Sequence, residues 1–353
     1  MAILLLAILL LAMKGLQVRP IGFQEDFLGR DQTESIKGFF LIFVFIRHAF
    51  QYVQKSGYEF SSMIDLPMKV LNNQLGQLIV VMFLFYSGYG ILESVKKSGE
   101  TYLKDFPYKR IFPTIINFDI AVLIFLIVGI ACAKEFSCLR VVQAFLGWES
   151  VGNSNWYIFD IVVCYILFWI SFFLTKRKGV VCTKPATMVL VIALLFFIVG
   201  MSFVKQTRWY NTVLAFGGGV FFSVYKDYII LFLKKKYWML FGGLTIVIII
   251  LKAVHYDLFC FRFNVLSLCF AIWIVMATMK IKMQNNALIW MGRHLFPLYI
   301  YQRLPMNILY DFNDGAFVRD YPLIYIAVCF VITVVISYFY RYWQVKVTTQ
   351  KTL

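Results

Sequence analysis

Long apolar segments follow one another along most of this chain, and they restrict its fold more than any other feature. A membrane-spanning helix needs about 20 predominantly apolar residues. Ten apolar runs, separated by charged or turn-rich breaks, cover 36–54, 76–95, 111–132, 156–174, 186–204, 211–225, 237–253, 264–279, 288–304 and 322–340. Several runs are short, so we expect some helices to extend into their flanks or to be broken. The sequence predicts an all-α polytopic membrane protein with a ten-helix core.

Composition and charge support the same class. Of the 353 residues, 61% are hydrophobic and only 15% are charged, whereas soluble domains carry about 25% charged residues. A net charge of +16 would suggest nucleic acid as the partner of a soluble protein. Here the Lys and Arg residues fall between the apolar runs and form no basic stripe. We therefore expect membrane lipid and no nucleic acid as a partner, and one membrane domain over 36–340.

The distribution of basic residues predicts the orientation. Cytoplasmic loops of membrane proteins carry an excess of Lys and Arg. The six loops and terminal segments on one side of the ten predicted spans carry 23 of the 34 Lys and Arg residues. The five alternate loops, with the span ends beside them, carry 10, and Arg47 lies inside the first span. We expect both ends of the core in the cytoplasm of a prokaryote, with the core in its cytoplasmic membrane.

Two terminal segments flank the predicted core. Residues 1–13 are apolar, but as a helix they reach only about 20 Å, short of a hydrocarbon core of roughly 30 Å. They lack a basic leader and a cleavage site of small residues, so they do not resemble a signal peptide. We expect 1–35 to form a short, partly inserted accessory helix and a basic cytoplasmic linker, or the remnant of a longer segment. Residues 341–353 are predicted to be a cytoplasmic tail.

Ionisable side chains inside a membrane are costly and indicate function. Lys37 and His48 are eleven residues apart, so on one helix they share a face and lie roughly 16 Å apart. The Lys37 cation, near the inner membrane surface, is suited to bind an anionic phosphate. The neutral His48 imidazole, deeper in the membrane, is suited to take a proton from a hydroxyl group. The alternative is a His bonded to a neighbouring helix and a Lys that extends to the membrane surface. The seven Cys show no metal-binding spacing, and we expect no metal.

Two intramembrane carboxylates and a glycine cluster complete the polar features. Asp160 lies at a depth similar to that of His48 and is a candidate to bond the imidazole and fix its tautomer; a structural contact between helices is the alternative. Asp119 is the second carboxylate within an apolar run. Residues 217–219 are three glycines, but no predicted strand precedes them and no Lys-Ser or Lys-Thr follows. We expect close helix packing or a helix break there, and no phosphate-binding loop.

Five segments carry a resemblance to a known family. The first is the pattern at the start of 36–54: the basic Lys37, then Gly38, an apolar run, and His48 eleven residues after Lys37. Four others follow in order: 85–89 (FYSGY), 106–113 (FPYKRIFP), 155–157 (NWY) and 291–302 (MGRHLFPLYIYQ). Together they resemble the motifs of the acyltransferase 3 family of integral membrane O-acyltransferases, over about residues 30–340. Two positions depart from the usual pattern: Lys37 stands where Arg is common, and Gln302 where many members have His.

The resemblance implies a function and site residues. Acetyl-coenzyme A would approach from the cytoplasm as acyl donor, with no bound cofactor, and a glycan or lipid-linked sugar would be the acceptor outside. His48 would act between them, as a general base or as a transient acyl carrier. The residues implied to hold the donor's phosphates are Lys37, Lys104, Lys109 and Arg110. For Lys104, ordinary membrane anchoring is an equal alternative. The residues implied at the acceptor are Asn155, Trp156, Tyr299 and Gln302.

Two other classes of protein compete with the enzyme. A transporter or flippase for a glycan or lipid precursor would also need ten helices with buried Lys, His and Asp. Inverted repeats or paired broken helices would favour it, and the sequence shows no such pairing. A membrane scaffold without chemistry would leave His48, Asp119 and Asp160 without a purpose. We therefore expect an acyltransferase that moves an acyl group, which we predict to be acetyl, to a hydroxyl group.

Overall fold

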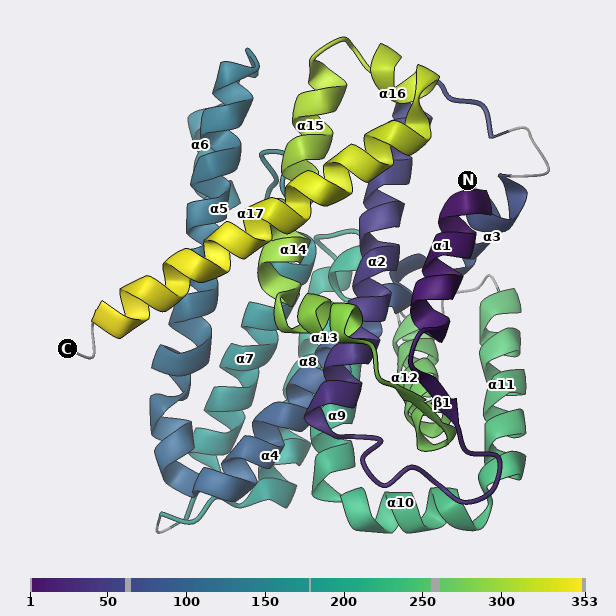
Figure 1. Cartoon of the computed structure of the whole chain (residues 1–353). Coiled ribbons are helices and arrows are strands. Elements are labelled where there is room, and N and C mark those ends of the chain that lie inside the picture. Colours follow the sequence, from purple (N-terminus) through teal and green to yellow (C-terminus); the bar gives the residue numbers. More distant parts are fainter. Residues whose placement is uncertain (1, 61–64, 178, 255–260, 351–353) are drawn as a thin grey trace.

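The computed structural model describes residues 2–60, 65–177, 179–254 and 261–350. Nearly all of its regular structure is helical (Figure 1). The helices are α1 (Ala2–Met13), α2 (Arg30–Lys55), α3 (Leu66–Leu75), η1 (Gly76–Val80), α4 (Val81–Phe106), η2 (Pro107–Ile111), α5 (Phe112–Ala131), α6 (Cys138–Phe145), α7 (Trp156–Leu174), α8 (Thr183–Ser202), η3 (Thr207–Trp209), α9 (Leu214–Val224), α10 (Lys226–Lys235), α11 (Tyr237–Ala253), α12 (Arg262–Lys280), α13 (Asn286–Arg293), α14 (Leu295–Tyr301), α15 (Arg303–Asp311), α16 (Ala316–Asp320) and α17 (Pro322–Gln350). Two short strands, β1 (Leu16–Val18) and β2 (Ile281–Met283), pair antiparallel.

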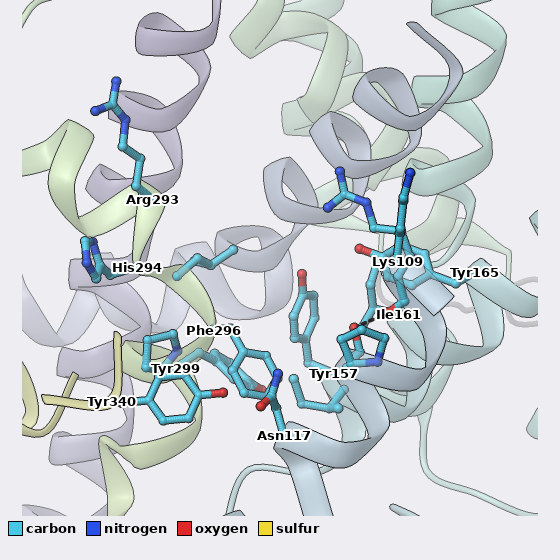
Figure 2. Close-up of a pocket in the computed structure, with 16 residues that line it drawn as sticks. Lys109, Asn117, Tyr157, Ile161, Tyr165, Arg293, His294, Phe296, Tyr299 and Tyr340 are labelled. Carbon is cyan, nitrogen blue, oxygen red and sulfur yellow. Dashed lines mark hydrogen bonds between the residues drawn. The ribbon is translucent and has the colours of Figure 1, made fainter. Parts of the chain in front are cut away.

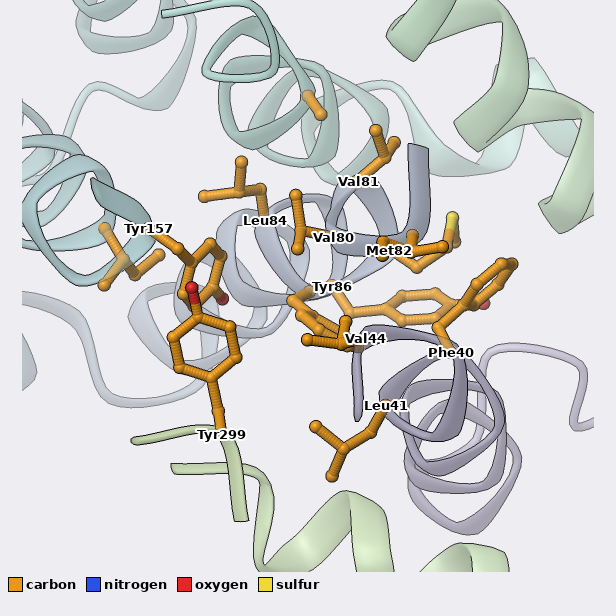
Figure 3. Close-up of a cluster of buried hydrophobic side chains, with 14 of the residues drawn as sticks. Phe40, Leu41, Val44, Val80, Val81, Met82, Leu84, Tyr86, Tyr157 and Tyr299 are labelled. Carbon is orange, nitrogen blue, oxygen red and sulfur yellow. The ribbon is translucent and has the colours of Figure 1, made fainter. Parts of the chain in front are cut away.

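Helix α2 lies at the centre of the fold and is buried along most of its length. Its side chains Phe40 and Val44 lie close to Met82 and Tyr86 of α4 (Figure 3). A helix that is covered by neighbours on several sides must be apolar over most of its circumference. This explains the uninterrupted apolar run in the first predicted span, and it places His48 inside the molecule.

Two helix pairs approach until their backbones touch, and glycine makes each approach possible. In α2, a Cβ on Gly38 would collide with the carbonyl oxygen of Leu288 in α13, and one on Gly292 of α13 would collide with the carbonyl of Glu34. In the α4 and α9 pair, a Cβ on Gly219 would collide with the carbonyl of Phe85. Small residues allow close helix packing in membranes. The expectation of close packing at 217–219 is confirmed.

The number of apolar helices is smaller than predicted. Within the described residues, six helical segments are long and apolar enough to cross a membrane, or seven if the bent pair α9 and α10 counts as one. The all-α membrane class is confirmed, but the ten-helix count is not. Helices α3 to α5 form one 66-residue helical run that contains two predicted spans. Helix α11 has only 17 residues, and the axes at α9 and α10 differ by 90°.

The predicted span 288–304 is broken into α13, α14 and α15. Pro297 and Pro305 are the third residues of α14 and α15. Proline lacks a backbone N–H and is tolerated only in the first turn of a helix, where that donor has no partner anyway. Each proline thus marks the start of a new helix. At the other end of the chain α17 does not stop near 340 but continues to Gln350, so the predicted tail begins as helix.

The segment before α2 holds the start of α13 in place. β1 pairs with β2 in a register that sets Leu16 opposite Met283. The Lys280 ammonium donates to the carbonyl oxygens of Pro20 (3.1 Å) and Gly22 (2.7 Å). These bonds tie the chain between α1 and α2 to the chain between α12 and α13. Figure 1 shows α10 and the end of α4 on one face of the molecule, and α6, α15 and α16 on the opposite face; we call these the α10 face and the α16 face.

Candidate functional site

One pocket with basic side chains in its lining has a volume of about 310 Å³. Its basic lining consists of Lys109, Arg110 and Arg293, and no Asp or Glu from the described residues lines it. We call it the Arg110 pocket. Figure 2 shows Arg293 and His294 on one side of it and Lys109 and Tyr165 on the other. The pocket therefore collects positive charge from two elements that are far apart in sequence.

Local structure explains how these basic residues reach the pocket. Lys109 and Arg110 lie in η2, a turn of π-helix between α4 and α5. Turns of this kind often occur at functional sites. The Arg110 side chain contacts Tyr102 (Nε to hydroxyl, 3.4 Å), and Lys109 pairs with Asp105 at 2.9 Å. Arg293 is the last residue of α13. The π-helical turn thus positions Lys109 and Arg110 at the pocket, and the end of α13 positions Arg293 there.

The second pocket has a volume of about 340 Å³ and contains His48. We call it the His48 pocket. Asn155 and Trp156, at the start of α7, also line it, and Asn155 donates a hydrogen bond of 2.9 Å to the carbonyl of Gly147. The predicted acceptor residues Asn155 and Trp156 therefore lie in the same pocket as His48.

Tyr299 lines both pockets. It is buried, and its ring centroid lies 6.3 Å from that of His48 and 5.0 Å from that of Tyr157. Tyr157 lines the Arg110 pocket, and Figure 3 shows the two tyrosine rings facing each other. The pair Tyr157 and Tyr299 thus lies between the Arg110 pocket and the His48 imidazole.

Gln302 joins this arrangement from the start of α15. Its Nε2 donates a hydrogen bond of 2.7 Å to the carbonyl oxygen of Tyr299. The side chain is fully buried and lies beside the His48 imidazole. The sequence placed Gln302 and Tyr299 at the acceptor, and the structure brings both next to His48.

Several buried polar atoms around this point have no hydrogen-bond partner of normal geometry within the described residues. They are His48 Nδ1, Ser154 Oγ, the Tyr299 hydroxyl and Gln302 Oε1. Most buried polar groups in proteins do find partners, and a missing partner needs an explanation. A bound substrate with hydroxyl and carbonyl groups would supply partners to such atoms.

The predicted bond between Asp160 and His48 is wrong. Asp160 is fully buried in α7, and neither carboxylate oxygen has a hydrogen-bond partner among the residues described. Its electrostatic neighbours are Tyr157, Cys164 and Tyr299. The similar depth predicted for the two residues did not bring their side chains together, and Tyr299 of α14 lies beside His48 instead.

Two predicted donor residues lie outside the lining of both pockets. Lys37 forms an ion pair of 2.9 Å with Glu34 one turn earlier in α2. Lys104 is exposed and pairs with Glu100 at 3.2 Å. Both residues stay predictions for the donor site, whereas Lys109 and Arg110 lie in a pocket whose charge suits it.

Sequence reasoning missed three arginines of the His48 pocket: Arg47, Arg208 and Arg303. A signal was present, because Arg47 directly precedes His48 and Arg303 directly follows Gln302. Arginine within an apolar run is costly and is a functional signal in itself. In the described part of the chain, no group of three or more His, Cys, Asp or Glu is placed to hold a metal ion.

Comparison with known families agrees with this geometry. A family whose sequence model is described as an acyltransferase domain matches residues 32–341. The chain therefore belongs to this family of membrane acyltransferases, the acyltransferase 3 family, and the earlier resemblance is confirmed. The match begins in the first turn of α2 and includes both pockets. No curated protein and no solved structure matches the chain.

Proposed function

We propose that this acyltransferase moves an acetyl group from acetyl-coenzyme A in the Arg110 pocket to a hydroxyl group of a glycan or lipid-linked sugar in the His48 pocket. The observation that carries the proposal is the position of Tyr299, which lines both pockets. Two substrates bound on either side of one side chain are close enough to exchange a small group. Holding two reactants in place is a major source of catalytic rate.

The charge of the Arg110 pocket supports its role as the donor site. Coenzyme A carries phosphates, and Arg and Lys bind phosphate through charge-assisted hydrogen bonds. Lys109, Arg110 and Arg293 are its basic lining residues. Lys109 also pairs with Asp105 (2.9 Å) and Arg293 with Asp31 (2.7 Å), so Arg110 is the one of the three without a carboxylate partner among the described residues. The thioester end of the donor would then point toward Tyr157 and Tyr299.

His48 supplies the chemistry in this proposal. As a general base, its imidazole takes the proton of the acceptor hydroxyl, the hydroxyl oxygen bonds to the thioester carbon, and the carbon–sulfur bond breaks. The departing thiolate then receives the proton. As an acyl carrier, the imidazole would first bond to the acyl carbon and release coenzyme A, and the hydroxyl would take the acyl group in a second step. The neighbouring Gln302 amide is suited to orient the hydroxyl, because an amide both donates and accepts.

We also propose that the α10 face is cytoplasmic and that the protein resides in the cytoplasmic membrane. The excess of Lys and Arg in the loops predicted to be cytoplasmic supports this orientation. It gives acetyl-coenzyme A access from the compartment in which it is made.

A transporter would share one feature with this structure, which is its interrupted helices. The bend between α9 and α10 and the breaks between α13, α14 and α15 resemble the discontinuous helices of transporters. The family match favours the enzyme. A transporter would not consume the donor, so donor consumption separates the two classes.

The proposal is tested by transfer of radiolabelled acetyl from acetyl-coenzyme A to glycan in membranes that contain the protein. The comparison is between wild type, His48→Ala and His48→Gln at matched expression, with folding checked by size-exclusion chromatography. We expect wild type to transfer label and both variants to lose at least about a hundredfold in rate, the lower range for a lost acid–base group. Equal rates in wild type and folded His48→Ala would reject the role of His48.

A further inference from the structure

The His48 pocket is strongly cationic, and its acyl-transfer chemistry alone does not require this. Three guanidinium groups line it, from Arg47, Arg208 and Arg303, and no Asp or Glu of the described residues does. An acceptor that is a neutral sugar needs hydroxyl and amide partners, which the lining residues Ser154 and Asn155 already offer. Gathering like charges costs electrostatic energy unless an anion joins them.

The three arginines come from different elements and line one pocket. Arg47 is the residue before His48 in α2, Arg303 begins α15, and Arg208 lies in η3. Arg47 and Arg303 are close enough to His48 to interact with it electrostatically. Two of the three charges therefore lie beside the reactive group, and the exposed Arg208 lines the same pocket.

Structural roles account for only part of this cluster. Arg303 donates from one terminal nitrogen to Gln51 and lies over the ring of Tyr52 (5.9 Å), but its buried Nε has no partner within the described residues. Neither Arg303 nor exposed Arg208 forms an ion pair with another described residue. Membrane anchoring does not explain them either, because in the proposed orientation this pocket lies toward the side that is poor in Lys and Arg.

The pocket continues into a second hollow, so an acceptor longer than one sugar has room. This neighbouring cavity of about 560 Å³ shares Ser150, Asn155 and Arg208 with the His48 pocket. Its own cation, Lys205, is paired with Glu149 at 3.0 Å and lies over the rings of Trp148 and Trp209. Arg208 therefore lies where the two cavities join. Unlike Lys205, it has no carboxylate partner among the described residues.

We propose that the acceptor carries an anionic group, a carboxylate or a phosphate, which Arg208 and Arg303 bind while His48 acts on a nearby hydroxyl. The inference rests on the proposed function and adds the chemical class of the acceptor. Arginine presents several N–H donors in a planar fork that matches both anions. An anionic sugar and a sugar joined to lipid through phosphate both have this chemistry.

The experiment uses the acceptor already present in membranes of cells that make the protein. Membranes are incubated with radiolabelled acetyl-coenzyme A, and the labelled product is applied to an anion exchanger. We expect the product to be retained. Carbodiimide-mediated reduction of carboxylates before chromatography abolishes retention if the anion is an acidic sugar, and mild acid abolishes it if the anion is a sugar-linked lipid phosphate.

Variants test whether the arginines recognise that anion. Arg208→Gln is expected to lower the initial rate at limiting acceptor about fivefold, as for a partly exposed ion pair, and Arg208→Lys is expected to retain most of it. Arg303→Gln, which is more buried, is expected to lose roughly tenfold or more. The donor KM should not change in any of them. The matched control is Arg319→Gln, whose arginine is exposed, pairs with Asp320 at 3.0 Å and lies outside both pockets.

Two results would overturn the inference. One is a labelled product that passes through the anion exchanger untreated, and the other is an Arg208→Gln rate equal to those of wild type and Arg319→Gln. A wild-type protein that consumes no acetyl-coenzyme A and labels nothing would instead reject the proposed function, and the inference with it.

Discussion

Single side chains from distant parts of the sequence meet at this site. His48, Trp156 and Tyr299 come from α2, α7 and α14. The sequence indicated the individual residues because a polar group in an apolar run is costly and therefore informative. It did not indicate which of them are neighbours. Similar depth predicts Asp160 as a partner of His48, but contact depends on how each helix is rotated about its axis, and depth does not determine that rotation.

At the residue scale, Tyr299 should act as the partition between the two pockets. Tyr299→Phe keeps the ring, so we expect acetyl transfer within about threefold of wild type. Tyr299→Ala removes the ring and opens the donor to water, so we expect transfer to fall at least about tenfold while hydrolysis of acetyl-coenzyme A rises. Both rates are measured with purified protein in nanodiscs. Equal loss in the two variants would show that the hydroxyl, and not the ring, matters.

Arg110 is the second residue with a separable role. Arg110→Gln removes a charge from the proposed donor pocket, so we expect the KM for acetyl-coenzyme A to rise about tenfold, as for a lost charge-assisted contact. The matched control is Lys97→Gln, an exposed lysine of α4 outside both pockets. A KM that is unchanged in Arg110→Gln would place the donor elsewhere.

Helix positions were predicted correctly where a single apolar run corresponds to a single helix. Helix α7 (Trp156–Leu174) and helix α11 (Tyr237–Ala253) occupy the predicted ranges, because charged or turn-rich residues flank each run. The prediction of one helix over 288–304 was wrong because hydropathy alone does not show a break in a helix. Pro297 and Pro305 carried that signal. The break matters for function, since α14 positions Tyr299 and α15 begins with Arg303 beside the site.

At the scale of elements, the contact between α2 and α13 should depend on glycine. Gly38→Ala would push a methyl group into the backbone of Leu288. We expect the melting temperature in detergent to fall by at least about 5 °C. The same change at Gly242 of α11, where nothing lies within 4 Å, should leave it unchanged or raise it, because Ala favours helix over Gly. A Gly38→Ala protein as stable as wild type would mean that this contact can relax.

At the scale of the whole molecule, the proposed function needs the donor and the acceptor on opposite sides of Tyr299, which lines both pockets. The site can accept a donor on one side and an acceptor on the other only if the membrane separates the two solutions at the height of Tyr157 and Tyr299. Sequence charge predicted the orientation through the summed excess of Lys and Arg, which does not need an exact helix count. The count itself required structure, because a broken or bent apolar run has the same composition as a straight one.

The most direct measurement of this account is acetyl transfer in sealed membrane vesicles of known orientation, with radiolabelled acetyl-coenzyme A added outside. The donor does not cross the membrane, so inside-out vesicles should label their glycan, and right-side-out vesicles should do so only after permeabilisation. His48→Ala should abolish labelling in both. Equal labelling of intact vesicles in the two orientations, or labelling that survives His48→Ala, would contradict the proposed transfer through His48 from a cytoplasmic donor to an acceptor on the other side of the membrane.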